Sequence, residues 1–221
     1  VKMSEGVDLN ATPSFRFLAL TSRVGVDVSG YYIGNLHFGA KVEGDFYAGL
    51  TAASKTDEAS AYFPSNSKIG GTAQARLRQA YATITWKDLP LGKSEKASVG
   101  LKIGQAWHPM AADHPHVFSL EVGAPFGPFS RTPLVQMDAN LGDHWVISGA
   151  AIWQQQYQSA GPVGASAIYM KYGMTPEMYA AVAYKTPSFL IRAGVDMVSI
   201  KPRVLGTSNG VTVKVSDRKT S

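Results

Sequence analysis

The chain contains no cysteine, and only 17% of its 221 residues are charged. Without cysteine it forms no disulfide, no thiol nucleophile and no cysteine-ligated metal site. It also lacks any apolar run of the roughly 20 residues that a membrane-spanning helix needs. The opening VKMSEGVDLN has neither a basic start nor an apolar stretch, so these residues do not read as a signal peptide. A membrane location would therefore require a closed β-barrel, because only helices and barrels satisfy all backbone hydrogen bonds in lipid.

The charges that are present are dispersed. The net charge is +5, but Lys and Arg stand singly between apolar residues instead of forming a basic run. This distribution does not favour a nucleic-acid partner.

Apolar and polar residues alternate along much of the chain, which is typical of β-strands with two different faces. In 36–46, apolar residues at alternate positions are separated by residues that include Lys41, Glu43 and Asp45, so one face carries three charges. Short turns follow several of these segments, among them Gly142-Asp143. We expect about ten strands, at 23–29, 36–46, 76–86, 96–104, 135–141, 144–154, 165–173, 177–184, 189–197 and 211–215.

One segment breaks the alternation. Arg76 and Arg78 share their parity with the apolar residues Ala80, Ile84 and Trp86. We predict a bulge near Gln79, which would shift the register and turn the arginines to the polar face.

Connection lengths and aromatic residues indicate the kind of sheet. Short turns alternate with longer polar connections at 51–71, 108–132 and 155–164, and many of the 10 tyrosines and 4 tryptophans lie near strand ends. Outer-membrane barrels have this layout, with aromatic girdles at both interfaces. We therefore predict an all-β chain forming one domain, 1–221, of a transmembrane antiparallel β-barrel of the porin type. A soluble ligand-binding β-barrel or sandwich is the alternative, and the scarcity of charge argues against it.

Three sequences in the middle of the chain are more specific. They are RLRQAYATITW at 76–86, VGLKIGQAWHPM at 99–110 and EVGAPFGPFSRTP at 121–133. They resemble segments of Bacteroidota outer-membrane porins, which are related to the DcaP-like trimeric porins, and GDF at 44–46 and KPR at 201–203 also suit that family. The resemblance implies a passive diffusion channel for small hydrophilic or anionic solutes, a homotrimer, and lipid and lipopolysaccharide of the bacterial outer membrane as surroundings.

The resemblance also implies that the connection at 108–132 folds into the lumen and narrows it. This connection holds five prolines and three phenylalanines, so it is stiff and partly apolar. His108, Pro125, Phe126 and Phe129 are the candidate constriction residues. An ordinary extracellular loop is the alternative.

A pore selects solutes by its size and by the charges that line it. The alternation assigns Lys41, Glu43, Asp45, Lys102, Gln136 and Asp138 to the lumen, and the resemblance adds Arg76, Arg78 and Arg131. A basic wall facing Glu43 and Asp45 would create a transverse field that favours anionic or zwitterionic solutes. Alternatively, these charges pair with one another and brace the barrel wall.

Other functions have weaker support. His108, His114 and His116 match no metal-ligand spacing, and the prolines between them exclude a helical pair, so we predict no metal and no cofactor. No Gly-x-Ser-x-Gly is present and no Ser/His/Asp group stands out, so we predict no enzymatic activity. A structural barrel subunit of an envelope complex remains an alternative function.

The end of the sequence suggests an incomplete barrel. Bacterial barrels close with a strand that ends in an aromatic residue, whereas this sequence ends VTVKVSDRKTS. We expect the chain to be the N-terminal part of a larger barrel, because an open sheet in lipid would expose unpaired edges.

Overall fold

The computed structural model describes residues 3–4, 7–8, 22–46, 75–92, 95–113, 130–154, 156, 168–173, 175–201, 205–208, 211–214 and 218–220. By contact the chain divides into two compact units, one of residues 1–24 and 44–76, the other of residues 25–43 and 77–221. No helix in the described ranges is long and apolar enough to cross a bilayer.

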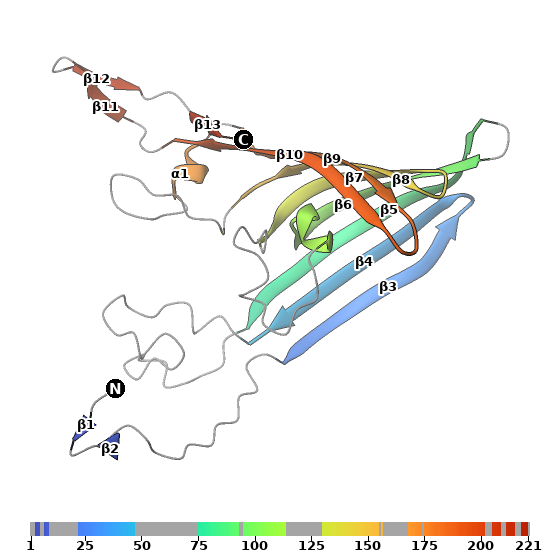
Figure 1. Cartoon of the computed structure of the whole chain (residues 1–221), viewed down its shortest axis with the longest axis horizontal. Helices are drawn as coiled ribbons and strands as arrows, with labels where there is room; N and C mark the ends of the chain where they lie inside the picture. The colour runs from blue at the N-terminus through green and yellow to red at the C-terminus, as the bar shows by residue number, and fades with distance from the viewer. Residues whose placement is uncertain are drawn as a thin grey trace. The chain divides into compact units, whose positions relative to one another are not determined.

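Eight strands of eight or more residues form one antiparallel sheet (Figure 1). Each pairs with its neighbours in chain order, and the short strand β13 (Arg218–Thr220) joins β10, giving the order β13-β10-β9-β8-β7-β6-β5-β4-β3. The all-β antiparallel class is therefore confirmed. The strands are β3 (Arg23–Ile33), β4 (Leu36–Asp45), β5 (Arg76–Leu91), β6 (Glu95–Trp107), β7 (Arg131–Leu141), β8 (Trp145–Ile152), β9 (Glu177–Lys185) and β10 (Leu190–Ile200).

Within the described residues the sheet is open. Its two edges are β3 and β13, each with a neighbour on one side only. Two separate hairpins, β1 (Met3–Ser4) with β2 (Val7–Asp8) and β11 (Leu205–Ser208) with β12 (Val211–Lys214), pair only within themselves.

Two of the ten expected strands are not part of the large sheet. The segment 211–215 was expected to extend it, but Val211–Lys214 pairs with β11. The expected strand at 165–173 is wrong over its described part, which forms the helical turn α1 (Ile168–Lys171). Tyr169 of α1 is 1% exposed, and its carbonyl accepts a hydrogen bond from the Lys201 backbone N–H, so contact with the end of β10 stabilises the turn over an extended strand.

The connections alternate in length, as predicted. The links β3–β4, β5–β6, β7–β8 and β9–β10 are short and meet at one end of the sheet, whereas residues 46–75, 108–130 and 153–176 connect strands at the other end. Gly34 and Gly142 lie in two of the short turns with φ of +58° and +61°, a conformation that glycine adopts without the steric cost of a Cβ atom.

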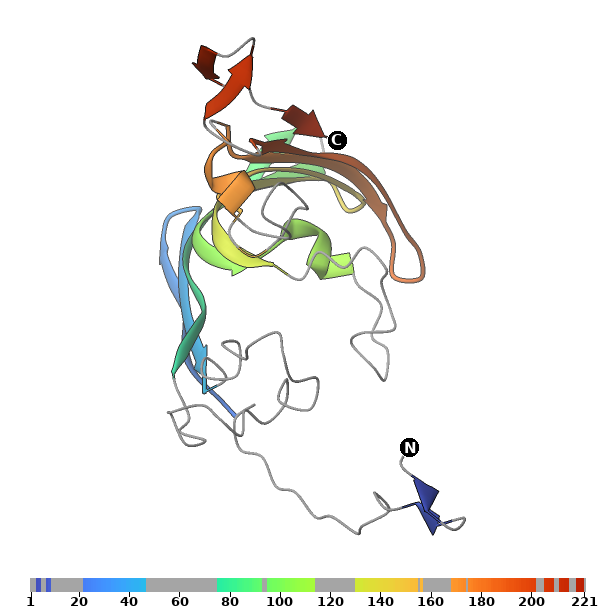
Figure 2. The same ribbon diagram turned by 90° about the vertical axis from the view of Figure 1, so that its left-hand side faces the viewer.

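The two faces of the sheet differ in burial. Along β7, Thr132, Leu134 and Gln136 are buried, whereas the alternate residues Pro133, Val135 and Met137 are exposed. The paired strands keep this phase, since Lys102 lies opposite Gln136 and Ile103 opposite Val135. Figure 2 shows that the strands curve around the 3₁₀ turn η3 (Pro109–Asp113), so the buried positions belong to the concave face.

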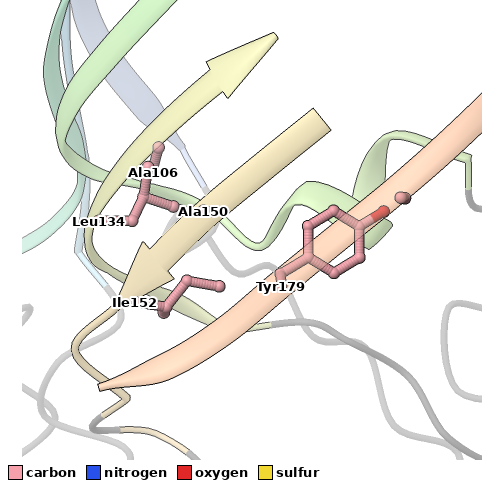
Figure 3. Close-up of a cluster of buried hydrophobic side chains, with 6 residues drawn as sticks. Ala106, Leu134, Ala150, Ile152 and Tyr179 are labelled. Atoms are coloured by element: carbon pink, nitrogen blue, oxygen red, sulfur yellow. The ribbon is translucent and has the colours of Figure 1, made fainter. Parts of the chain in front are cut away.

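Small apolar side chains pack on the concave face next to η3 (Figure 3). The cluster is formed by Ala106, Leu134, Ala150, Ile152, Tyr179 and Ala181, with Tyr81 packed against it. Ala106, Ala150 and Ala181 contribute small side chains from three strands, and Ile152 is completely buried in the cluster.

Strand β5 changes phase at the predicted place. Leu77 is 50% exposed, Arg78 and Gln79 are both buried, and alternation then continues with half-buried Tyr81 and Thr83. Two consecutive buried residues agree with the bulge predicted near Gln79. The register shift in the pairing of β5 with β6 lies further along, between Trp86 and Leu89, where Asp88 has a φ of +57°.

Candidate functional site on the concave face

Ion pairs connect charged side chains on strands β4 and β5. In the second unit, Arg78 Nε donates to Glu43 Oε1 at 2.7 Å, and both side chains are largely buried. Lys41 Nζ lies 3.8 Å from Glu43 Oε2 and 3.9 Å from Asp27 Oδ2. Arg78, Glu43 and Lys41 thus form one connected network of alternating charge.

The first unit contains a separate pair. Arg76 donates two hydrogen bonds to Asp45, from Nε at 2.9 Å and from Nη2 at 2.6 Å. Asp45 is 4% exposed. This bidentate geometry fixes both side chains more firmly than a single contact would. The sequence analysis nominated Lys41, Glu43, Asp45, Arg76 and Arg78 as lumen residues. Which of them contact one another depends on how β4 and β5 are paired.

Three further predicted lumen residues lie on neighbouring strands β6 and β7. Gln136 Nε2 donates to Asp138 Oδ2 at 2.7 Å, and Lys102 lies directly opposite Gln136. The Lys102 ammonium group is 5.5 Å from the centroid of the Tyr81 ring. Among the described residues Lys102 has no carboxylate partner, so it leaves a positive charge on the concave face.

Arg131 is placed differently from the other arginines. It is the first residue of β7 and shares its parity with exposed Pro133 and Val135, and its guanidinium carbon lies 4.7 Å from the centroid of the Trp107 ring. Of the four candidate constriction residues, only His108 lies in the described part of the chain. Pro125, Phe126 and Phe129 lie outside the described residues.

His108 is the centre of a buried polar cluster. Its Nε2 lies 3.0 Å from Glu177 Oε1 at the start of β9 and 3.6 Å from Asp196 Oδ2 in β10. The side chains of His108 and Glu177 have no exposed surface. Gln154 Nε2 donates to the other oxygen of Glu177 at 2.8 Å and to Ser130 Oγ at 3.2 Å.

Two opposing influences act on the His108 ring. Burial lowers its pKa, but the contacts with Asp196 and Glu177 outweigh burial and raise the pKa to about 9. The Met110 backbone N–H donates to Nδ1 at 3.2 Å, which opposes a proton on that nitrogen. The neutral ring favoured by this hydrogen bond carries its proton on Nε2, toward the carboxylates.

The backbone brings the ends of residues 108–130 together beside this cluster. The His108 backbone N–H donates to the Ser130 carbonyl at 2.9 Å. Sequence reasoning identified His108 but missed Glu177, Asp196 and Gln154. Alternation along β10 places Asp196 on the polar face, but the meeting of β6, β9 and β10 residues depends on the curvature of the sheet.

The convex face has the opposite character. Large apolar side chains on six neighbouring strands are 39–58% exposed there. Trp86 and Trp145 lie near the short turns, and Trp153 lies at the other end of β8. The apolar set is Ile84, Trp86, Ile103, Val135, Met137, Trp145, Ile147, Met178, Val182, Ile191, Val195 and Met197.

Comparisons with family models, with curated proteins and with solved structures found no match.

Proposed function

We propose that this protein is an outer-membrane porin, a passive diffusion channel for small hydrophilic, anionic solutes. The observation that carries the proposal is the inverted polarity of the sheet. The convex face exposes large apolar residues on six strands, while the concave face carries Lys41, Glu43, Arg78, Lys102 and Asp138. A soluble sheet of this kind would leave an extensive apolar patch in water, whereas lipid covers such a face.

The height of the apolar face supports a membrane location. Trp145 and Trp153 bracket it on β8, and eight residues of antiparallel strand span about 27 Å. At a tilt of about 40° this is roughly 21 Å of membrane depth, close to the apolar band of about 25 Å in outer-membrane barrels. Tryptophans at both limits match the interfacial girdles of such proteins.

In this proposal the open edges are closed by further strands, because unpaired backbone groups are not tolerated in lipid. These strands come from the same gene product or from other chains. The sequence resemblance favours the first arrangement and a trimer of complete barrels. The concave ion pairs and Lys102 would then line the lumen.

Channel recordings test the proposal. The protein expressed from its complete gene is expected in the outer-membrane fraction and should give open-channel currents in planar bilayers. Because Lys102 has no carboxylate partner among the described residues, Lys102→Glu should lower the anion-to-cation permeability ratio measured from reversal potentials. Lys185→Glu makes the same charge change at the exposed end of β9 and should alter that ratio less.

Absence of current from folded protein would contradict the channel function. Equal effects of the two charge reversals would contradict the placement of Lys102 in the conduction path. The two results are separable, because the first concerns conduction itself and the second only its selectivity.

A further inference from the structure

Three potential metal ligands from separate parts of the chain meet at the buried cluster around His108. His108 Nε2, a carboxylate oxygen of Glu177 and a carboxylate oxygen of Asp196 all lie within 4.8 Å of one another. His108 directly follows β6, Glu177 is the first residue of β9, and Asp196 lies within β10. They therefore come together through the tertiary structure and not because they are close in the sequence.

The spacing of these atoms suits a zinc ion. Zinc binds imidazole nitrogen at about 2.0–2.1 Å and carboxylate oxygen at about 2.0–2.2 Å, which separates tetrahedral ligands by about 3.4 Å. The observed distances from His108 Nε2 are 3.0 Å to Glu177 and 3.6 Å to Asp196, on either side of that value. Zinc binds both imidazole nitrogen and carboxylate oxygen, so one imidazole with two carboxylates offers ligand types that zinc takes.

The cluster also has a charge that a cation would neutralise. Two carboxylates face one imidazole, so the three side chains together are negative even when His108 is protonated. Burial of uncompensated charge is unfavourable. In addition, Asp196 Oδ1 is a buried oxygen with no hydrogen-bond partner among the described residues, which leaves that carboxylate incompletely satisfied.

The surroundings supply outer contacts that orient the ligands. Gln154 donates to Glu177 Oε2, the oxygen that does not face His108, and the Tyr179 and His108 rings pack in a T-shaped arrangement. Such supporting contacts hold metal ligands in position. From this arrangement we propose that His108, Glu177 and Asp196 bind one Zn²⁺, with a fourth coordination position left for water.

The state of the His108 ring gives the site a distinctive signature. The hydrogen bond from Met110 to Nδ1 places the proton of the neutral, metal-free ring on Nε2. Zinc at Nε2 displaces that proton, and the neutral metal-bound ring carries its proton on Nδ1. Binding thus requires the Met110 N–H to give up its contact, and the change of tautomer is observable.

Zinc titration of the full chain tests the site. Protein folded in detergent and freed of metal with EDTA is dialysed, and ZnCl₂ is titrated against a competing chelator, with bound zinc measured by mass spectrometry. We expect one zinc per chain. Asp196→Asn, which keeps the side-chain size, should weaken binding by about 100-fold or more, because loss of a ligand exceeds the 10–100-fold effect of losing an outer contact.

Asp138→Asn is the matched control, because Asp138 is a concave-face carboxylate that contacts Gln136 and lies outside the cluster. It should leave zinc affinity unchanged. If Asp196→Asn fails to fold, as judged by tryptophan fluorescence, Glu177→Gln replaces it.

Nitrogen-15 spectra of labelled histidine provide a second measurement. The resonance absent from His108→Gln should lose its Nε2–H and take the Nδ1–H form of a metal-bound ring when zinc is added. Folded wild-type protein that retains no zinc would overturn the proposal, as would equal binding by the ligand variants. These outcomes are independent of channel activity, so failure of the zinc site and failure of the porin function are distinguishable.

Discussion

A single arginine on the convex face tests whether that face lies in lipid. Met137 lies opposite Gly149, midway along β8 between Trp145 and Trp153, and is 54% exposed. In the proposed orientation this is the bilayer midplane. Met137→Arg should therefore lower the free energy of unfolding from a bilayer by about 2–4 kcal/mol. On a water-exposed sheet the same change would be worth within about 0.5 kcal/mol.

Leu141→Arg provides the depth control. Leu141 lies on the same face of the same strand, but it pairs with Trp145 near the short turns. There the cost of arginine should fall to about 0–1 kcal/mol. Denaturant titrations of protein folded into phospholipid vesicles, followed by tryptophan fluorescence, measure both variants. Equal unfolding free energies for wild type, Met137→Arg and Leu141→Arg would refute a lipid-facing convex surface.

Three further predictions concern the fold and its buried charges. Gly104→Ala should destabilise the sheet by about 2–4 kcal/mol in denaturant titration, because Gly104 has a φ of +132° and a Cβ there would collide with the backbone of β5. Gly149→Ala, where the new Cβ has only ordinary contacts, should cost far less. Glu43→Gln should cost on the order of 3 kcal/mol in the same assay, since it removes the charge of the carboxylate that the buried Arg78 guanidinium contacts. An effect as small as that of a surface ion pair would contradict this. In metal-free protein, His108 should contribute stability that is fully present below pH 6.5 and is lost as the pH rises through about 9, because its pKa is raised on folding. The unfolding free energies of wild type and His108→Gln should then differ more at pH 6 than at pH 10, and a difference that grows with pH would contradict the raised pKa.

The strands were predictable because a sheet with two different faces leaves a period-two pattern in the sequence. That pattern located all eight long strands, the turn at Gly142 and the change of phase in β5. The segment at 165–173 misled the prediction, since a short apolar run suits a strand or a helical turn equally. Only the burial of Tyr169 next to the end of β10 distinguishes the two.

For the charged residues of β4, β5 and β6, the sequence predicted which residues share a face but not how they pair, and for the His108 cluster it missed the partners as well. Alternation identifies Lys41, Glu43 and Lys102 as residues of one face, because a strand fixes which side each residue faces. It cannot give the partner of each, which depends on strand register and curvature. The cluster of His108, Glu177 and Asp196 is the extreme case, because its members lie up to 88 residues apart and meet only after β6, β9 and β10 have curved around η3.

The order of the strands has a consequence for how such a chain changes over generations. Each strand from β4 to β9 pairs with the strand before it and the strand after it in the chain. A hairpin can therefore be added or removed next to β3 or after β10 without changing the pairing of the other strands. In the proposed barrel, duplication of a two-strand unit would alter the circumference in steps of two strands, while the residues that form the existing polar contacts keep their neighbours.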